Sequence, residues 1–141
     1  MDEKYFLIAY KEAMKSLKSD DVPVGAVIVK KGKIIAKSHN ERIKRKSVEK
    51  HAEYSAVIKA CKKLKTWNLN DCELYCTLKP CSMCEALINN SKIANVYYLI
   101  DKPVFKNEFK SNYTQTNVCE MLKCKYKSEL SQFFEKLRKK I

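Results

Sequence analysis

Two short motifs, far apart in the sequence, limit how this chain can fold. The first is His51-Ala52-Glu53, and the second is Pro80-Cys81-Ser82-Met83-Cys84, with Cys81 standing 30 positions after His51. One imidazole and two thiolates are a common ligand set for zinc, and three protein ligands leave the fourth position of a tetrahedral ion to water. A fold that uses both motifs must therefore bring them together around a catalytic zinc ion.

The residues around each motif predict that both stand at the start of a helix. Pro80 suits the first helical turn, where its missing N–H group costs nothing. Cys81 and Cys84 are three positions apart, so they are neighbours on one helical face. In the first turn, unpaired N–H groups and the positive end of the helix dipole favour thiolate anions. His51 opens the other predicted helix and supplies a neutral nitrogen ligand.

Glu53 adds a proton carrier to the predicted zinc site. On an ideal helix its side chain diverges from that of His51 by about 200°, but at a helix start a long side chain can bend back towards the metal. Zinc lowers the pKa of a bound water to about 7. A carboxylate nearby can take that proton and deliver it to a ring nitrogen and then to a leaving amine. The two motifs therefore predict attack of zinc-activated water on a base.

Each motif alone is also compatible with a different kind of site. A Cys-x-x-Cys pair can be a redox site or part of a structural zinc site. A structural site would need a fourth ligand, which His39, the only other histidine, could provide. The joint pattern, with Pro80 before the first cysteine and helical periodicity after each motif, favours the catalytic zinc site.

Apolar periodicity predicts helices that alternate with strands along a single domain, residues 1–141. A helix over 3–18 precedes two strands, 23–29 and 33–37, which the turn Lys31-Gly32 joins into a hairpin. The apolar residues at helical spacing in the first helix are Phe6, Leu7, Ala9, Tyr10, Ala13, Met14 and Leu17. The other predicted elements are a basic loop over 39–50, helices over 51–64, 81–90 and 126–140, and strands over 73–78 and 94–100, with 101–118 unassigned. This order predicts an α/β fold with a mixed sheet covered by helices on both faces.

Cysteine usage and hydropathy predict a cytoplasmic protein that binds no membrane. The seven cysteines are an odd number and no export signal precedes them, which argues against a disulfide framework. Cys61 and Cys76 lie in apolar stretches and are predicted to be buried thiols. Cys119 and Cys124 could form a second metal pair, but without nearby histidines we interpret them as packing or surface thiols. No run reaches the roughly 18 apolar residues of a membrane span.

The charge balance has two interpretations. The chain carries 29 basic and 16 acidic residues, a formal net charge of +13. A surplus of this size favours a polyanionic partner such as RNA. However, only three of the basic residues are arginines, and the abundance of Lys, Asn, Ile and Tyr is also typical of an A/T-rich genome. Both interpretations stay open on composition alone.

The motifs and their surroundings resemble the zinc-dependent nucleoside and nucleotide deaminase superfamily, in particular its bacterial tRNA-specific wobble adenosine deaminases. The similarity extends to the segments 22–27, 74–81 and 91–93, within about residues 5–100. The chain departs from the family pattern at Lys79, where Glu is usual, and at 101–106, where a glycine-rich loop is usual. These differences concern the choice of substrate, because contacts that flank the target set it.

The resemblance implies a three-layer α/β/α sandwich with a mixed central sheet, of the cytidine deaminase-like type. It implies a homodimer with one Zn²⁺ per subunit, held by His51, Cys81 and Cys84, and Glu53 as the proton shuttle. The implied reaction is hydrolysis of the wobble adenosine of a tRNA to inosine. The implied partner is the tRNA anticodon arm, and no DNA is expected.

Three further residues match substrate-binding positions of the family. Asn40 matches an asparagine that hydrogen-bonds the target base, Val24 would line the pocket, and Asp101 matches an aspartate. Asn40 also fits a turn or strand-end residue, and Val24 also fits a buried strand valine.

Two other functions use the same metal ligands. One is deamination of a free base or nucleoside, such as guanine, cytosine or cytidine. The other is a non-catalytic zinc-binding RNA module or partner subunit. Glu53 argues against the second, since a structural zinc site has no use for a carboxylate beside the metal.

Overall fold

The computed structural model describes residues 1–101, 112, 113, 115 and 120–139. The chain divides into two compact units, Met1–Val104 and Phe105–Ile141. The first unit contains every residue that the sequence predicts for the site. The expectation of a single domain over residues 1–141 stays a prediction.

A four-stranded mixed sheet forms the centre of the first unit. Its strands run in the order β2-β1-β3-β4. They are β1 Gly25–Lys30, β2 Lys33–His39, β3 Cys72–Leu78 and β4 Asn95–Ile100. β1 pairs antiparallel with β2 and β3, whereas β3 and β4 are parallel. A parallel pair needs a crossover connection, and helix α4, Ser82–Asn90, supplies it. All four predicted strands are present.

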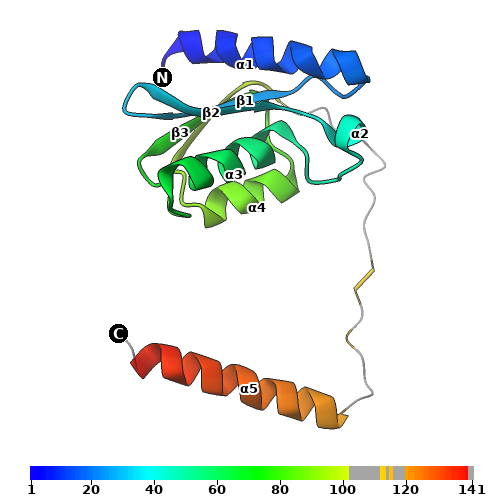
Figure 1. Cartoon of the computed structure of the whole chain (residues 1–141), viewed down its shortest axis with the longest axis vertical. Helices are drawn as coiled ribbons and strands as arrows, with labels where there is room; N and C mark the ends of the chain where they lie inside the picture. Colours follow the sequence, from blue (N-terminus) through cyan, green and yellow to red (C-terminus); the bar gives the residue numbers. More distant parts are fainter. Residues whose placement is uncertain (102–111, 114, 116–119, 140–141) are drawn as a thin grey trace. The chain divides into compact units, whose positions relative to one another are not determined.

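Helices cover both faces of this sheet, as Figure 1 shows. Helix α1, Glu3–Lys15, lies on one face, and α3, Ala52–Leu64, lies with α4 on the other. Successive strand residues point to opposite faces, so β1 and β3 contribute to two cores. The core towards α1 contains Tyr5, Ala9, Val27, Val29 and Tyr75. The core towards α3 and α4 includes Ile28, Leu74, Cys76, Ala56, Val57 and Ile88. The predicted sandwich of three layers is confirmed.

Helix α1 approaches β1 so closely at Gly25 that no side chain fits there. A Cβ atom at Gly25 would overlap the carbonyl oxygen of Ala9 and lie 2.7 Å from the backbone nitrogen of Ala13. Ala9 and Ala13 are buried against the strand, so α1 turns its small residues inwards. Several of the larger apolar residues at helical spacing in the predicted helix over 3–18 stay at the surface. Those that are at least 50% exposed are Leu7, Tyr10 and Leu17.

The sequence predicted the β1–β2 hairpin correctly, whereas the segments after α1 and β2 differ from the prediction. Lys31 and Gly32 have φ values of 50° and 74°, as a two-residue type I′ hairpin requires, so the predicted hairpin is confirmed. The predicted helix over 3–18 is α1 followed by a short 3-10 helix, Ser16–Ser19. The segment predicted as a basic loop contains a helix, α2, Arg42–Arg45, and β2 extends into it as far as His39.

The second unit contains helix α5, Glu120–Lys139, which begins earlier than the predicted helix over 126–140. Residues 112, 113, 115 and 120–139 of this unit are described, so most of the unassigned segment 101–118 and the thiol of Cys119 lie outside the described residues. Cys124 is an exposed free thiol. In the first unit Cys76 is buried as predicted, whereas Cys61 is only partly buried.

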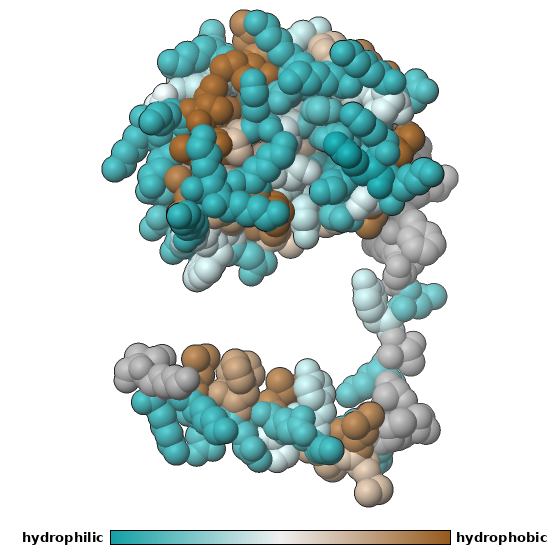
Figure 2. Space-filling view, viewed as in Figure 1, coloured by the Kyte–Doolittle hydropathy of each residue, from teal (hydrophilic) through white to brown (hydrophobic). Residues whose placement is uncertain are grey.

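The surface of the first unit is mostly hydrophilic on the face seen in Figure 2. None of the helices in the described ranges has the length and apolar character needed to cross a membrane.

Candidate metal centre and active site

The site forms where the first turns of α3 and α4 meet. His51 is the N-cap residue of α3 and Cys81 that of α4, and both have extended backbones, with ψ of 150° and 172°. Neither side chain makes a capping hydrogen bond to its own helix. Both side chains are therefore free to act as ligands, as the sequence predicted for two helix starts.

The geometry of the three predicted ligands fits a tetrahedral zinc ion. Nδ1 of His51 lies 3.5 Å from Sγ of Cys81 and 3.5 Å from Sγ of Cys84. Bond lengths of about 2.0 Å to nitrogen and 2.3 Å to sulfur at a tetrahedral angle separate the two atoms by about 3.5 Å. The three ligand atoms all lie within 4.8 Å of one another. His51, Cys81 and Cys84 are thus positioned to hold a metal ion, with room for one more ligand.

Two backbone hydrogen bonds hold the segments that lead into these helices. The amide of Lys79 donates to the carbonyl oxygen of Ile100 at 2.9 Å, just before the Pro80-Cys81 pair. The amide of Glu41 donates to the carbonyl oxygen of Lys50 at 2.8 Å, just before His51. Each ligand-bearing cap is therefore fixed by a neighbouring strand end.

Hydrogen bonding shifts the pKa values of the two cysteine ligands in opposite directions. A hydrogen bond from Cys84, with another from His51, lowers the pKa of Cys81 to about 3. The same bond to Cys81, together with burial, raises the pKa of Cys84. These shifts favour the thiolate at Cys81, and metal binding would release the proton of the Cys84 thiol.

Glu53 is buried in the first turn of α3, with only 4% of its surface exposed. Burial raises the pKa of its carboxyl group, while hydrogen bonds, including one with Cys84, partly oppose that rise. The carboxyl group therefore lies beside a metal ligand and has a pKa shifted towards neutrality. A group of this kind is suited to exchanging a proton during a reaction near pH 7.

His39 does not join the metal ligands. Its Nδ1 lies 4.0 Å from Oε2 of Glu12, and its Nε2 lies 3.9 Å from Oε1 of Glu41. Within the described ranges, the His/Cys/Asp/Glu cluster suited to a metal contains His51, Cys81 and Cys84 and no fourth residue. The alternative of a structural zinc site closed by His39 is therefore disfavoured.

Asn40 is a buried strand-end residue whose side chain is hydrogen-bonded at both ends. Its Nδ2 donates to the carbonyl oxygen of Val22 at 3.1 Å, and its Oδ1 accepts from the amide of Arg42 at 3.2 Å. Its own amide donates to the carbonyl oxygen of Val24 at 3.0 Å. A side-chain amide has two donor hydrogens and two acceptor lone pairs. One donor hydrogen and one acceptor lone pair of Asn40 therefore stay available to a ligand.

The other two predicted substrate residues differ in their placement. Val24 is buried in the core that faces α3 and α4, and its carbonyl oxygen accepts a hydrogen bond from the amide of Asn40. Asp101 follows the end of β4 and is exposed. Its assignment to substrate binding stays a prediction.

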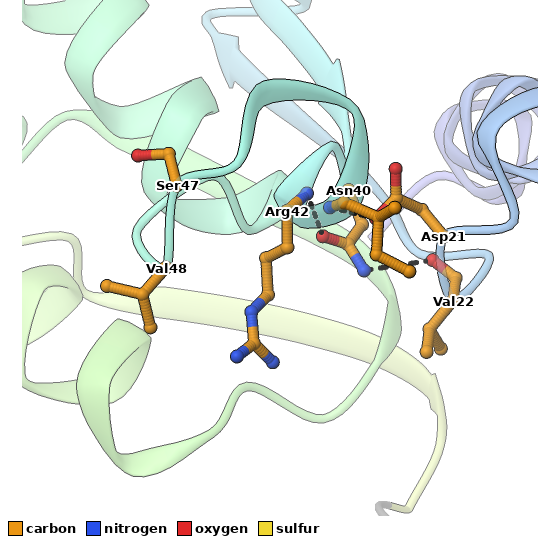
Figure 3. A pocket seen from close by; sticks show the side chains of 7 residues that line it. Asp21, Val22, Asn40, Arg42, Ser47 and Val48 are labelled. Atoms are coloured by element: carbon orange, nitrogen blue, oxygen red, sulfur yellow. Dashed lines mark hydrogen bonds between the residues drawn. The ribbon is translucent and has the colours of Figure 1, made fainter.

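A pocket beside Asn40 contains residues that the sequence did not single out. Its volume is about 430 Å³, and helix α2 forms one of its walls (Figure 3). The lining residues are Asp21, Val22, Asn40, Arg42, Ile43, Ser47 and Val48. We call it the α2 pocket. The sequence offered little signal for it, because Asp21 looks like part of a helix stop and Arg42 like one cation of a basic loop.

Asp21 holds the start of helix α2 beside this pocket. It is buried, and its carboxylate accepts from the amide of Ile43 at 2.6 Å, the amide of Lys44 at 3.2 Å and the hydroxyl of Ser19 at 2.6 Å. Although burial opposes ionisation, these hydrogen bonds hold the pKa of Asp21 below its ordinary value. An ionised Asp21 therefore accepts from two amides in the first turn of α2, whose N-cap residue is Glu41.

Comparison with known proteins identifies relatives along the whole chain. A family model described as the cytidine and deoxycytidylate deaminase zinc-binding region matches residues 1–100. The tRNA-specific adenosine deaminase of Aquifex aeolicus (strain VF5) is 36% identical over 157 aligned residues, covering 100% of this chain and 99% of that protein. The protein of the same name from Bacillus subtilis (strain 168) is 36% identical over 148 residues, covering 99% and 92%.

Solved structures with the same fold include enzymes for two different bases. A tRNA:A34 deaminase that edits A to I at the wobble position of transfer RNA superposes with a TM-score of 0.68 at 38% identity, over 71% of this chain and 73% of that one. Guanine deaminase from Bacillus subtilis superposes with a TM-score of 0.75 at 28% identity, over 92% and 94%. These likenesses confirm the cytidine deaminase-like sandwich.

Proposed function

The chain belongs to the cytidine and deoxycytidylate deaminase zinc-binding family, and from this premise we propose that it hydrolyses the wobble adenosine of a tRNA to inosine. The observation that carries the proposal is the meeting of His51, Cys81 and Cys84 beside the buried carboxyl group of Glu53. The full-length similarity to tRNA-specific adenosine deaminases supports adenosine as the target.

Zinc is the cofactor, and His51, Cys81 and Cys84 are the residues we propose to hold it. When bound, zinc supplies the Lewis acidity that activates a water molecule for attack on carbon 6 of adenine. Glu53 takes one proton from the attacking water and passes it to the ring nitrogen beside carbon 6. It then takes the second proton, from the new hydroxyl on carbon 6, and delivers it to the amino group, which leaves as ammonia. The raised pKa of Glu53 suits both the taking and the giving of a proton.

Asn40 and Val24 are proposed to position the adenine. Because the side chain of Asn40 is fixed by Val22 and Arg42, its remaining donor and acceptor have a set direction before the base arrives. A preorganised amide of this kind gains more from one hydrogen bond than a mobile one. Val24, whose carbonyl oxygen accepts from the amide of Asn40, would provide an apolar wall for the base.

The partner that we propose is the anticodon arm of a tRNA. The net charge of +13 supports a polyanionic partner. We also propose that the enzyme works as a homodimer, as the resemblance to the tRNA deaminases implies, and that it works in the cytoplasm. Sedimentation of the zinc-loaded protein would test the dimer directly.

The test of the function is a substrate panel. Zinc-loaded protein is incubated with an anticodon stem-loop that carries adenosine at the wobble position and with the free bases adenine, guanine and cytosine, and with cytidine. Release of ammonia and conversion of the wobble nucleotide to inosine are measured. Inosine formation in the stem-loop alone supports the proposal, whereas turnover of a free base without inosine formation overturns it.

Guanine deamination is the second candidate, because the guanine deaminase of Bacillus subtilis shares the fold over nearly the whole chain. Salt would separate the two activities. An enzyme that binds RNA through phosphates loses affinity steeply as salt rises, whereas turnover of a neutral base should change little between about 50 and 200 mM salt.

A further inference from the structure

We infer that His39 is a positioning residue whose protonation joins Glu12 to Glu41. The joined carboxylates fix the end of β2 and with it Asn40, which is proposed to bind the target base. The inference rests on the proposed function, because it concerns how Asn40 is held in the same site. His39 is the last residue of β2. The two carboxylates belong to different elements, since Glu12 lies in α1 and Glu41 is the N-cap residue of α2.

Both ring nitrogens of His39 face a carboxylate at a distance just beyond that of a hydrogen bond. Nδ1 lies 4.0 Å from Oε2 of Glu12, and Nε2 lies 3.9 Å from Oε1 of Glu41. A hydrogen bond between such atoms needs a distance of about 3.2 Å or less. The side chain of His39 is 19% exposed, so water has limited access to the ring. A small movement of either carboxylate would therefore complete the contact.

The charge of the imidazole decides whether both carboxylates can be bound at once. A neutral imidazole has one N–H donor and one acceptor nitrogen, whereas an imidazolium has two donors. In the neutral form one nitrogen presents its lone pair to a carboxylate oxygen, and that contact is repulsive. In the charged form each nitrogen can donate a charge-assisted hydrogen bond. Histidine ordinarily changes charge between about pH 5 and 8, so the connection from α1 to α2 should form as the pH falls through this range.

Glu12 gains from a second partner. It is buried, with 5% of its surface exposed, and none of the described groups donates a hydrogen bond to its Oε2. Nζ of Lys15 lies 2.6 Å from this oxygen, an ion pair without the alignment of a hydrogen bond. A buried acceptor without a hydrogen bond destabilises the fold. A proton on Nδ1 of His39 would supply the missing bond.

Other charged groups also face His39. In α2, Arg45 donates to Oε2 of Glu41 at 3.0 Å, and Nζ of Lys44 lies 3.9 Å from the same oxygen. The oxygen of Glu41 nearest to His39 is the other one, Oε1. Burial opposes the ionisation of Asp21, but its hydrogen bonds and a charged His39 lower the pKa of its carboxyl group. A proton gained by His39 therefore acts on α1, on α2 and on the segment before β1.

The strand end between the two carboxylates carries the proposed substrate contact. Asn40 stands between His39 and Glu41, and its amide donates to the carbonyl oxygen of Val24 at 3.0 Å. The amide of Glu41 donates to the carbonyl oxygen of Lys50, directly before the first proposed zinc ligand. When His39 connects α1 to Glu41, this segment is held more firmly, and a preorganised Asn40 binds the base more tightly. The effect should appear in KM, because the groups that move protons in the reaction are unchanged.

The test follows KM and the charge of His39 over the same pH range. Zinc-loaded wild type, His39→Gln and Glu12→Gln are assayed for inosine formation in a stem-loop with a wobble adenosine, from about pH 5 to about pH 8. NMR signals of the imidazole nitrogens report the charge of His39. The chain has one other histidine, His51, and His39→Gln identifies the signal. Glu3→Gln is the matched control, since it removes an exposed carboxylate from the same helix.

We expect the KM of wild type and of Glu3→Gln to rise about tenfold with increasing pH, the size of one hydrogen bond to a charged group. Its midpoint should match the NMR titration of His39. In His39→Gln and Glu12→Gln the KM should stay near the high-pH value, while the pH profile of kcat stays that of wild type. Zinc content and melting temperature verify that each variant is folded. A His39 signal that does not titrate in this range, or a KM that keeps its pH dependence in either variant, would overturn the inference.

Failure of the proposed function would look different. Wild type would then form no inosine at any pH, whereas the amides of Asn40 and Glu41 would still exchange more slowly when His39 is protonated, after correction for the intrinsic effect of pH. Hydrogen exchange of these two amides in wild type and Glu12→Gln therefore tests the connection between α1 and α2 without a substrate. Equal protection of the wild-type amides at both ends of the pH range would refute this role of His39 even if inosine forms.

Discussion

The Nδ1 atom of His51 lies 3.5 Å from the Sγ atom of Cys84, although 33 positions separate the two residues in the sequence. His51 caps α3, and Cys84 is a fully buried residue in the first turn of α4. The contact therefore joins the starts of two helices that cover one face of the sheet. A metal ion at this point would add its binding free energy to the stability of the folded chain.

Cys84→Ser should weaken zinc binding by more than about 100-fold, which is the upper end of the loss when only a supporting partner of a ligand is removed. It should also lower the melting temperature, because a buried ligand is lost along with the metal. Zinc per chain is measured after dialysis against a weak chelator. Cys124→Ser changes an exposed thiol in α5 and should keep its zinc. Full zinc occupancy in Cys84→Ser would contradict the ligand assignment.

Glu53→Gln should lower kcat by a factor of about 10² to 10⁴, the usual contribution of a positioned proton carrier. The amide keeps the shape of the side chain but cannot exchange a proton, so zinc content should stay that of wild type. Initial rates of inosine formation at saturating RNA give kcat. The control is Glu85→Gln, an exposed carboxylate in the first turn of α4, which should retain wild-type rates. A Glu53→Gln enzyme with normal kcat would refute the proton shuttle.

The metal centre could be predicted from the sequence because short motifs mark its ligands. Each ligand stands at a helix start, and the residue types and spacings that mark a helix start are visible in the chain. The layers of the fold were also predictable, since β1 is apolar in both registers and such a strand must be covered on both faces. The structure shows Val27 facing α1 and Ile28 facing α3 and α4.

The α2 pocket could not be predicted, because the contacts that build it join distant segments. Helix α2 is four residues long and has no apolar periodicity. It is held by the carboxylate of Asp21, which is 22 positions away from Ile43. The exposure of Leu7 and Tyr10 has a similar origin. The close approach of α1 to Gly25 decides which face of that helix is buried, and hydropathy alone does not report this approach.

Gly25→Ala should destabilise the protein by about 3 kcal/mol or more, the upper part of the range for overpacking a core. The added methyl group has no space, because the backbone of α1 at Ala9 and Ala13 occupies its position. Chemical unfolding of the zinc-loaded protein measures the loss. Gly32→Ala serves as the control, since no atom lies within 4 Å of its added Cβ. Gly32→Ala should cost only about 1 kcal/mol, because alanine is less stable than glycine in a left-handed backbone conformation. Equal losses in the two variants would argue against the close packing of α1.

Asp21→Asn should loosen α2 and lower the stability of the protein at pH 7. The pKa of Asp21 is below its ordinary value in the folded state, so the ionised form stabilises the fold. This contribution is present above the ordinary pKa of about 4 and is lost as pH falls through the lower folded value. The difference between wild type and Asp21→Asn should therefore be largest near pH 7 and shrink below about pH 4.

Two measurements would test this role of Asp21. Urea unfolding at several pH values follows the stability difference, and hydrogen exchange follows the amides of Ile43 and Lys44, which donate to the Asp21 carboxylate. Both amides should exchange faster in Asp21→Asn. The neighbouring Asp20 is exposed and has a φ of 58°, a conformation that asparagine also tolerates, so Asp20→Asn should change neither result. If the two variants behave alike, the order of α2 does not depend on the charge of Asp21, and the fixed geometry of the α2 pocket needs another source.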